Sequence, residues 1–287
     1  MLNRSTNPAK PNYILPEKPI LLKLRTMSER LHPKSPAFQR DTESPQSDIE
    51  LYRAICRSAE FGEKRNPLAD MQTLLELKRL ELSPNPSLVS VDSGPIIFVP
   101  NHFGRNLAAR DYYLPTTEES FISVAATTLS VANLFQIDEK VSWVLKKLPP
   151  NRLEYRKTRQ TQNATISCYG YIGIEEGKSY NTMKEIVKRI KSGKHIGMFA
   201  QLKPHHELRH INPRFPQMLE IIQRGIECVQ IMPVSIYIEG NIINVMLSKP
   251  VVMSKQDDAL VLTERIMRIV AKGLPDNLQG AYGSPSG

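Results

Sequence analysis

Short apolar runs alternate with segments whose apolar residues recur at helical spacing, from about residue 88 to residue 238. Runs rich in β-branched and aromatic residues predict strands; they are 88–91, 95–99, 120–126, 170–174, 195–200 and 229–238. Helical spacing or composition predicts helices between most of these runs; they are 105–113, 128–148, 180–191 and 216–227. Such alternation is typical of α/β proteins, so we expect a mostly parallel mixed sheet with helices on both faces.

Further helices and a hairpin are predicted before residue 88 and after residue 238. Helices are predicted from Asp48 and after Pro67, the second ending by Pro84 and Pro86. A strand at 242–247 follows a hairpin signal, and a last helix is expected at 257–272. We therefore expect one α/β domain at 48–275, of which 48–87 is a helical N-terminal part. A tail at 276–287, rich in Gly, Ser and Pro, is predicted to be flexible.

The first 47 residues carry prolines too closely spaced for long helices or central strands. We expect a disordered or loosely docked arm there. Within it, residues 20–31 could form a short basic amphipathic helix that suits a membrane surface. A short helix packed on the domain is the alternative interpretation.

The charge and the aromatic content of the chain limit the kinds of molecule that we expect it to bind. The 287 residues carry a net charge of +9, which attracts nucleic acid, anionic lipid or acidic substrates. Aromatic residues make up 7% and do not alternate with basic ones, which argues against a base-stacking platform. The chain has no apolar run of about 18 residues, no secretory signal, and three widely spaced cysteines. These features favour reduced thiols in the cytoplasm.

The candidate chemistry begins at Asn101-His102, directly after the apolar run Ile96-Ile97-Phe98-Val99-Pro100. Open α/β sheets place their ligands beyond the carboxyl ends of strands. Histidine is also the side chain best suited to transfer a proton near neutral pH. A strand-end histidine with a structural hydrogen bond is the alternative interpretation.

Four stretches in sequence order resemble blocks of the glycerolipid acyltransferase family, which includes the lysophosphatidate acyltransferases. Residues 96–102 resemble its strand followed by Asn-His, and 170–176 resemble its Gly-x-Ile-Phe-Ile-Asp-Arg block. Residues 196–203 stand in the place of its Phe-Pro-Glu-Gly-Thr-Arg block, and 231–236 match its Val-Pro-Val strand. The resemblance covers about residues 94–250 and implies the family's α/β fold.

The resemblance also implies an activity and its residues. His102 would be the general base in transfer of a fatty acyl group from a CoA or carrier-protein thioester to a hydroxyl or amine of a lipid-type acceptor. No resident cofactor is implied. Asp111 is the candidate to orient the histidine, while phosphate or carboxylate would be bound by Arg105, Lys203 and Arg209. The protein would be cytoplasmic and peripheral on the membrane's cytoplasmic face.

The departures from the family pattern fall on its chemical residues. Leu107 stands where the family has the aspartate of HxxxxD, and Glu176 stands where it has a phosphate-binding arginine. Gln201 and Leu202 replace the Glu-Gly of the third block. These replacements favour a second hypothesis, a catalytically degenerate scaffold that binds lipids or acyl chains. A basic nucleic-acid-binding protein is a third, weaker hypothesis.

Two other clusters of polar residues have a composition that could bind an anion or a metal ion. Arg152, Arg156, Lys157 and Arg159 form either an anion-binding patch or a solvated loop. His206 and His210 have a spacing that could hold zinc on a helix, but Pro204 and Pro213 bracket a short loop. No metal is therefore expected. The chain contains no GxSxG elbow and no Gly-rich phosphate loop, so the nucleophile would be the acceptor's own hydroxyl or amine.

Overall fold

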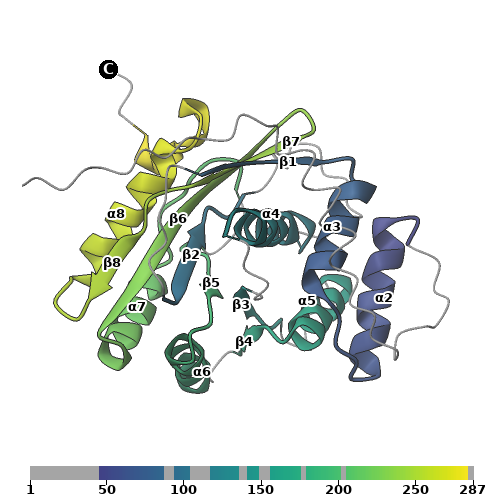
Figure 1. Ribbon diagram of the computed structural model, residues 1–287, viewed down its shortest axis with the longest axis horizontal. Coiled ribbons are helices and arrows are strands. Elements are labelled where there is room, and N and C mark those ends of the chain that lie inside the picture. The colour runs from purple at the N-terminus through teal and green to yellow at the C-terminus, as the bar shows by residue number, and fades with distance from the viewer. Residues whose placement is uncertain are drawn as a thin grey trace, which may run out of the picture. The chain divides into compact units, whose positions relative to one another are not determined.

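A sheet of eight strands, in the order β1-β7-β6-β2-β5-β3-β4 with β8 also paired to β6, runs through the computed structural model (Figure 1). The structure describes residues 45–86, 94–103, 117–135, 141–148, 156–175, 179–201 and 205–283. The strands are β1 (Glu81–Pro86), β2 (Ile96–Pro100), β3 (Ser142–Lys146), β4 (Ile172–Ile174), β5 (Ile196–Gly197), β6 (Cys228–Glu239), β7 (Ile242–Leu247) and β8 (Val251–Ser254). β2 pairs in parallel with both β5 and β6, whereas β7 and β8 pair with β6 in antiparallel fashion.

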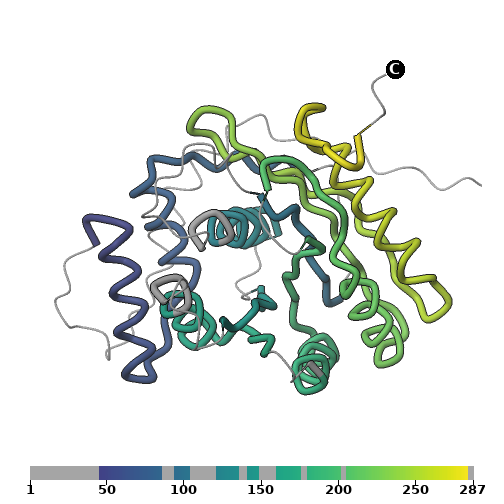
Figure 2. Tube along the Cα trace, turned by 180° about the vertical axis from the view of Figure 1, so that it is seen from behind, coloured from purple at the N-terminus to yellow at the C-terminus, as the bar shows by residue number. Residues whose placement is uncertain are grey.

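Helices cover both faces of this sheet. They are α2 (Asp48–Glu60), α3 (Pro67–Leu77), α4 (Thr117–Phe135), α5 (Arg156–Tyr169), α6 (Ser179–Lys191), α7 (Arg214–Gly225) and α8 (Ala259–Lys272). Side chains of a strand point alternately to opposite faces. Ile96 and Phe98 therefore join a core with α2 to α5, while Ile97 and Val99 join a second core with α6 to α8. The course of the backbone through these helices can be followed in Figure 2. The predicted fold class is confirmed.

The strand predicted at 120–126 is wrong, because these residues lie inside α4. Residues 121–132 of α4 are buried on all sides, and the hydroxyls of Thr127 and Thr128 donate to the carbonyls one turn earlier. A buried helix of this kind lacks a polar face. A short apolar run then gives no period that separates a helix from a strand.

The helix predicted at 128–148 ends at Phe135, and residues 142–146 form β3 instead. Ser142, Trp143 and Val144 are all buried, because helices cover both faces of β3. A strand buried on both faces loses the alternation that marks it in a sequence.

The polar segment 151–168, interpreted as a solvated loop or an anion patch, contains α5. This helix packs against α2, with the Cys168 thiol donating to the carbonyl of Ile55 at 3.3 Å. The long-range contact with α2 stabilises a sequence whose own pattern does not indicate a helix. The side chains of the basic cluster lie outside the described residues.

Strands β1 and β8 were not predicted. The helix after Pro67 ends at Leu77, and Arg79 adopts a positive φ of 53° before the chain enters β1. Pro84 and Pro86 lie within β1, which is paired with β7 along one side. Proline is tolerated in an edge strand because its missing N–H faces away from the sheet. The predicted elements at 88–91 and 105–113 lie outside the described residues.

The described part of the predicted tail, residues 276–283, contains short helical turns. Residues Asp276–Leu278 and Gly280–Tyr282 form two 3₁₀ turns. The N–H of Leu208 donates to the carbonyl of Leu278 at 2.9 Å, and the N–H of Ala281 donates to the carbonyl of Leu208 at 3.0 Å. This backbone pairing holds a segment whose composition alone predicts mobility.

Candidate functional site

The carboxyl ends of four parallel strands meet at one edge of the sheet, in the order β2, β5, β3 and β4. Asn101 and His102 follow β2, and the segment 198–201 follows β5. The first, third and fourth family-like blocks therefore lie on adjacent strands, and the second lies on β4 at the sheet's edge. This edge is where open α/β sheets bind ligands.

Asn101 fixes the exit of the chain from β2. Its side chain is 5% exposed, donates to the carbonyl of Ile236 at 2.8 Å and accepts from the N–H of Ile236 at 2.7 Å. Its own N–H donates to the carbonyl of Val234 at 3.2 Å. These bonds continue the pairing of β2 with β6 beyond Pro100. Asn101 therefore fixes the position of the backbone from which His102 projects.

His102 is held from the segments that follow β5. Its N–H donates to Oε1 of Gln201 at 2.9 Å, and its carbonyl accepts from the N–H of His205 at 3.0 Å. Its ring stacks on Phe199, with centroids 4.2 Å apart and planes inclined by 20°. Phe199 in turn lies 5.4 Å from the Trp143 ring. The imidazole therefore ends a stack of aromatic side chains at the carboxyl edge.

Burial lowers the pKa of His102 to about 4, because the charged imidazolium is poorly solvated there. A hydrogen bond with the backbone of Gln201 opposes this shift, and the nearby His205 adds to it. The ring is therefore neutral at physiological pH. A neutral imidazole can accept a proton, although a pKa this low makes it a weak base in the absence of a bound partner.

Gln201 is the second polar side chain of this site. It is 4% exposed, and its Oε1 is used by His102. Its Nε2 is buried without a hydrogen-bond partner among the described residues. A buried amide N–H without a partner is unfavourable, and an oxygen atom of a bound ligand could accept a hydrogen bond from it.

The other predicted site residues are not brought to His102 by the described structure. Asp111, Arg105 and Lys203 lie outside the described residues, as do Leu107, Glu176 and Leu202. Arg209 is described, and its Nη2 forms an ion pair with Oε1 of Glu207 at 2.8 Å. His205, His206 and His210 are exposed. Within the described ranges, no group of three His, Cys, Asp or Glu residues could hold a metal ion.

Lys147 was missed by the sequence reasoning. It follows β3, and its Nζ contacts Oε1 of Glu175 beyond β4 at 2.7 Å. This places an ion pair on the same edge as His102, two and three strands away from β2. Two consecutive lysines shortly before Pro149 could have indicated a polar strand end. The helix predicted over 128–148 left no strand there, so the lysines were not predicted as site residues.

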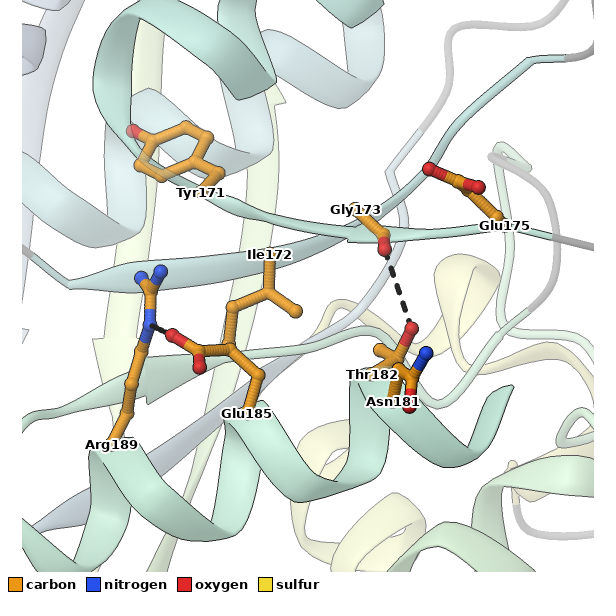
Figure 3. Close-up of a pocket in the computed structure, with 8 residues that line it drawn as sticks. All are labelled: Tyr171, Ile172, Gly173, Glu175, Asn181, Thr182, Glu185 and Arg189. Carbon is orange, nitrogen blue, oxygen red and sulfur yellow. Dashed lines mark hydrogen bonds and ion pairs between the residues drawn. The ribbon is translucent and has the colours of Figure 1, made fainter. Parts of the chain in front are cut away.

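A pocket of about 330 Å³ lies between β4 and α6 (Figure 3). Nε of Arg189 contacts Oε1 of Glu185 at 2.8 Å, and its Nη1 donates to the carbonyl of Gly170 at 2.8 Å. Thr182 donates to the carbonyl of Gly173 at 3.3 Å, as Figure 3 shows. The charged side chains that line this pocket, including Glu175, are all in ion pairs. The charged groups of this pocket are therefore already neutralised by one another, whereas the edge around His102 offers a neutral imidazole and an amide N–H that has no partner among the described residues.

Comparison with known proteins shows a distant likeness to solved structures. No family model and no curated protein matches this chain. The crystal structure of the 1-acyl-sn-glycerophosphate (LPA) acyltransferase PlsC from Thermotoga maritima is similar, with 12% identity, 88% of each chain covered and a TM-score of 0.40. A likeness of this degree supports no statement about activity. Among the described helices, none combines the length and the apolar character needed to cross a membrane.

Proposed function

We propose that the protein is an acyltransferase that moves a fatty acyl group from a CoA or carrier-protein thioester to a hydroxyl or amine of a lipid-type acceptor. The observation that carries this proposal is the position of His102. Its neutral imidazole lies just beyond the carboxyl end of β2, the strand between β5 and β6, on the edge where such sheets bind ligands. The four family-like blocks support the reaction class.

In the proposed reaction, His102 removes the proton from the acceptor hydroxyl while the acceptor oxygen attacks the thioester carbonyl. The carbon–sulfur bond breaks as the new ester forms, and the thiolate leaves with the proton returned by the imidazolium. The products are the acylated acceptor and the free thiol. The buried Nε2 of Gln201 is a donor that a substrate oxygen could use.

The remaining roles in this proposal belong to residues named from the sequence. Asp111 orients His102, and phosphate or carboxylate groups of the substrates are bound by Arg105, Lys203 and Arg209. The acceptor lies in an anionic bilayer, which the basic chain contacts peripherally on the cytoplasmic face.

The direct test measures thiol release from a long-chain acyl-CoA in the presence of a lysophospholipid, together with mass spectrometry of the acylated product. We expect His102→Ala to lower kcat/KM by about 100-fold or more, because general-base catalysis contributes on this order. His206→Ala removes an exposed histidine of the loop after β5 and should retain wild-type activity. Full activity in His102→Ala would contradict the proposed role.

A second candidate function, binding of lipids or acyl chains without turnover, is favoured by the burial of His102 and its pKa of about 4. It predicts that lipid copurifies with the protein and that wild type releases no thiol from acyl-CoA. Mass spectrometry of the copurified lipid, combined with the assay above, separates the two functions.

A further inference from the structure

We propose that Gln201 is the positioning residue of His102, holding both its backbone and its ring from the segment that follows β5. This inference rests on the proposed function for its effect on turnover, while the contact itself is independent of any activity. It adds a contact from the neighbouring strand to the orienting role that the proposed function gives to Asp111.

The backbone contact follows from the way the two strands end. β2 and β5 are paired up to Phe98 and Gly197, and the N–H of Met198 still donates to the carbonyl of Phe98 at 3.0 Å. Beyond this point the N–H of His102 has no strand neighbour. The side chain of Gln201 supplies the acceptor at 2.9 Å in a position that is 4% exposed. A buried N–H left without such an acceptor would lose its solvation with no bond to offset it.

The contact with the ring comes from the same short segment after β5, residues 199–201. Phe199 stacks on the imidazole, and the backbone of Gln201 hydrogen-bonds with it. The hydrogen bond between Asn212 and the carbonyl of Ala200, at 2.9 Å, ties this short segment to the loop before α7. When one ring nitrogen is engaged by a backbone group, the tautomer is set and the other nitrogen is the one that can accept a proton.

The amide side chain of Gln201 places no charge beside the ring. A neutral amide satisfies the N–H of His102 without favouring the imidazolium. A carboxylate in this buried position would stabilise the imidazolium, since an opposite charge within about 4–6 Å favours the charged form. Gln201 therefore holds His102 without adding a negative charge that would offset the effect of burial on the pKa of the ring.

The test is an NMR titration of the His102 ring in wild type, Gln201→Glu and Gln201→Met. We expect Gln201→Glu to raise the pKa of His102 by about 1–3 units. Gln201→Met should broaden or split the His102 ring resonances, because the acceptor is lost. In the acyl-transfer assay, Gln201→Met should lower kcat by about 10-fold to 100-fold with little change in KM for the acyl donor, because displacing a catalytic group slows the chemical step.

Gln223 provides the matched controls. It is also a buried glutamine, in the last turn of α7, and its Nε2 donates to the carbonyls of Ser254 and Asp257 at 3.0 Å. Gln223→Met should cost stability but leave the His102 resonances and kcat unchanged. Gln223→Glu should leave the pKa of His102 unchanged.

An unaltered His102 titration in Gln201→Glu together with unaltered ring resonances in Gln201→Met would overturn the inference. Equal effects of the Gln223 variants would overturn it as well. If Gln201→Glu does not fold, the Gln201→Met resonances decide the outcome. Should the Gln201 effects appear while His102→Ala keeps full activity, the proposed function fails and the positioning contact stands.

Discussion

At the scale of single residues, His102 couples its burial to the stability of the protein. Its pKa is about 4 in the fold against an ordinary value of 6.5, so between these values the unfolded chain binds the proton more readily. The stability associated with the neutral ring is complete above about pH 6.5 and is lost as the pH falls toward 4. The full loss is on the order of 3 kcal/mol.

This linkage is measurable by urea unfolding at pH 7 and pH 4.5. Wild type should lose about 2–3 kcal/mol more between these pH values than His102→Gln, whose side chain does not titrate. His206→Gln, which removes an exposed histidine, should behave like wild type. Equal losses in wild type and His102→Gln would contradict the burial of the imidazole.

At the scale of elements, a buried ion pair joins α3 and α5 to the turn after α2. Arg65 donates to both carboxylate oxygens of Asp70 at 2.7 Å, and the hydroxyl of Tyr169 donates to Oδ2 at 2.9 Å. Asp70 is 7% exposed. Removing Asp70 leaves the guanidinium of Arg65, whose side chain is 21% exposed, without its carboxylate, which is more costly than losing a fully exposed pair.

Asp70→Ala should therefore lower the free energy of unfolding by about 2 kcal/mol, and Tyr169→Phe by about 1 kcal/mol. Chemical denaturation monitored by circular dichroism measures both. Glu220→Ala, which removes an exposed partner 3.9 Å from Arg224, should change the free energy of unfolding by less than about 0.5 kcal/mol. A similar small effect of Asp70→Ala would show that the buried pair does not hold these helices together.

At the scale of the whole molecule, the chain's last turns support the loop beside the candidate site. Leu208 is 1% exposed and bonds to Leu278 and Ala281, while His205 in the same loop bonds to His102. Gly280 has a φ of +50°, and a Cβ there would lie 2.1 Å from the carbonyl oxygen of Leu208. Only glycine fits this approach.

Gly280→Ala should consequently increase hydrogen exchange in residues 205–212 and lower Tm. Gly240→Ala is the matched control, because Gly240 has a φ of +60° but open space around it. Its cost should be the backbone strain alone, about 1–2 kcal/mol, with no change in exchange at 205–212. Equal exchange in the two variants would mean that the last turns do not support the loop.

The sequence by itself determined the α/β class, β2 with its terminal Asn-His pair, the hairpin of β6 and β7, and the three helices α6 to α8. These elements carry a one-sided apolar pattern or a local turn signal that survives without the rest of the chain. The elements α4, β3 and α5 were misassigned, because burial on all sides or support from a distant helix removes the periodic pattern. Only the tertiary structure brought Gln201 to His102 and Lys147 to the same edge, because strand order joins residues about 45 to 100 positions apart and no local pattern encodes that order.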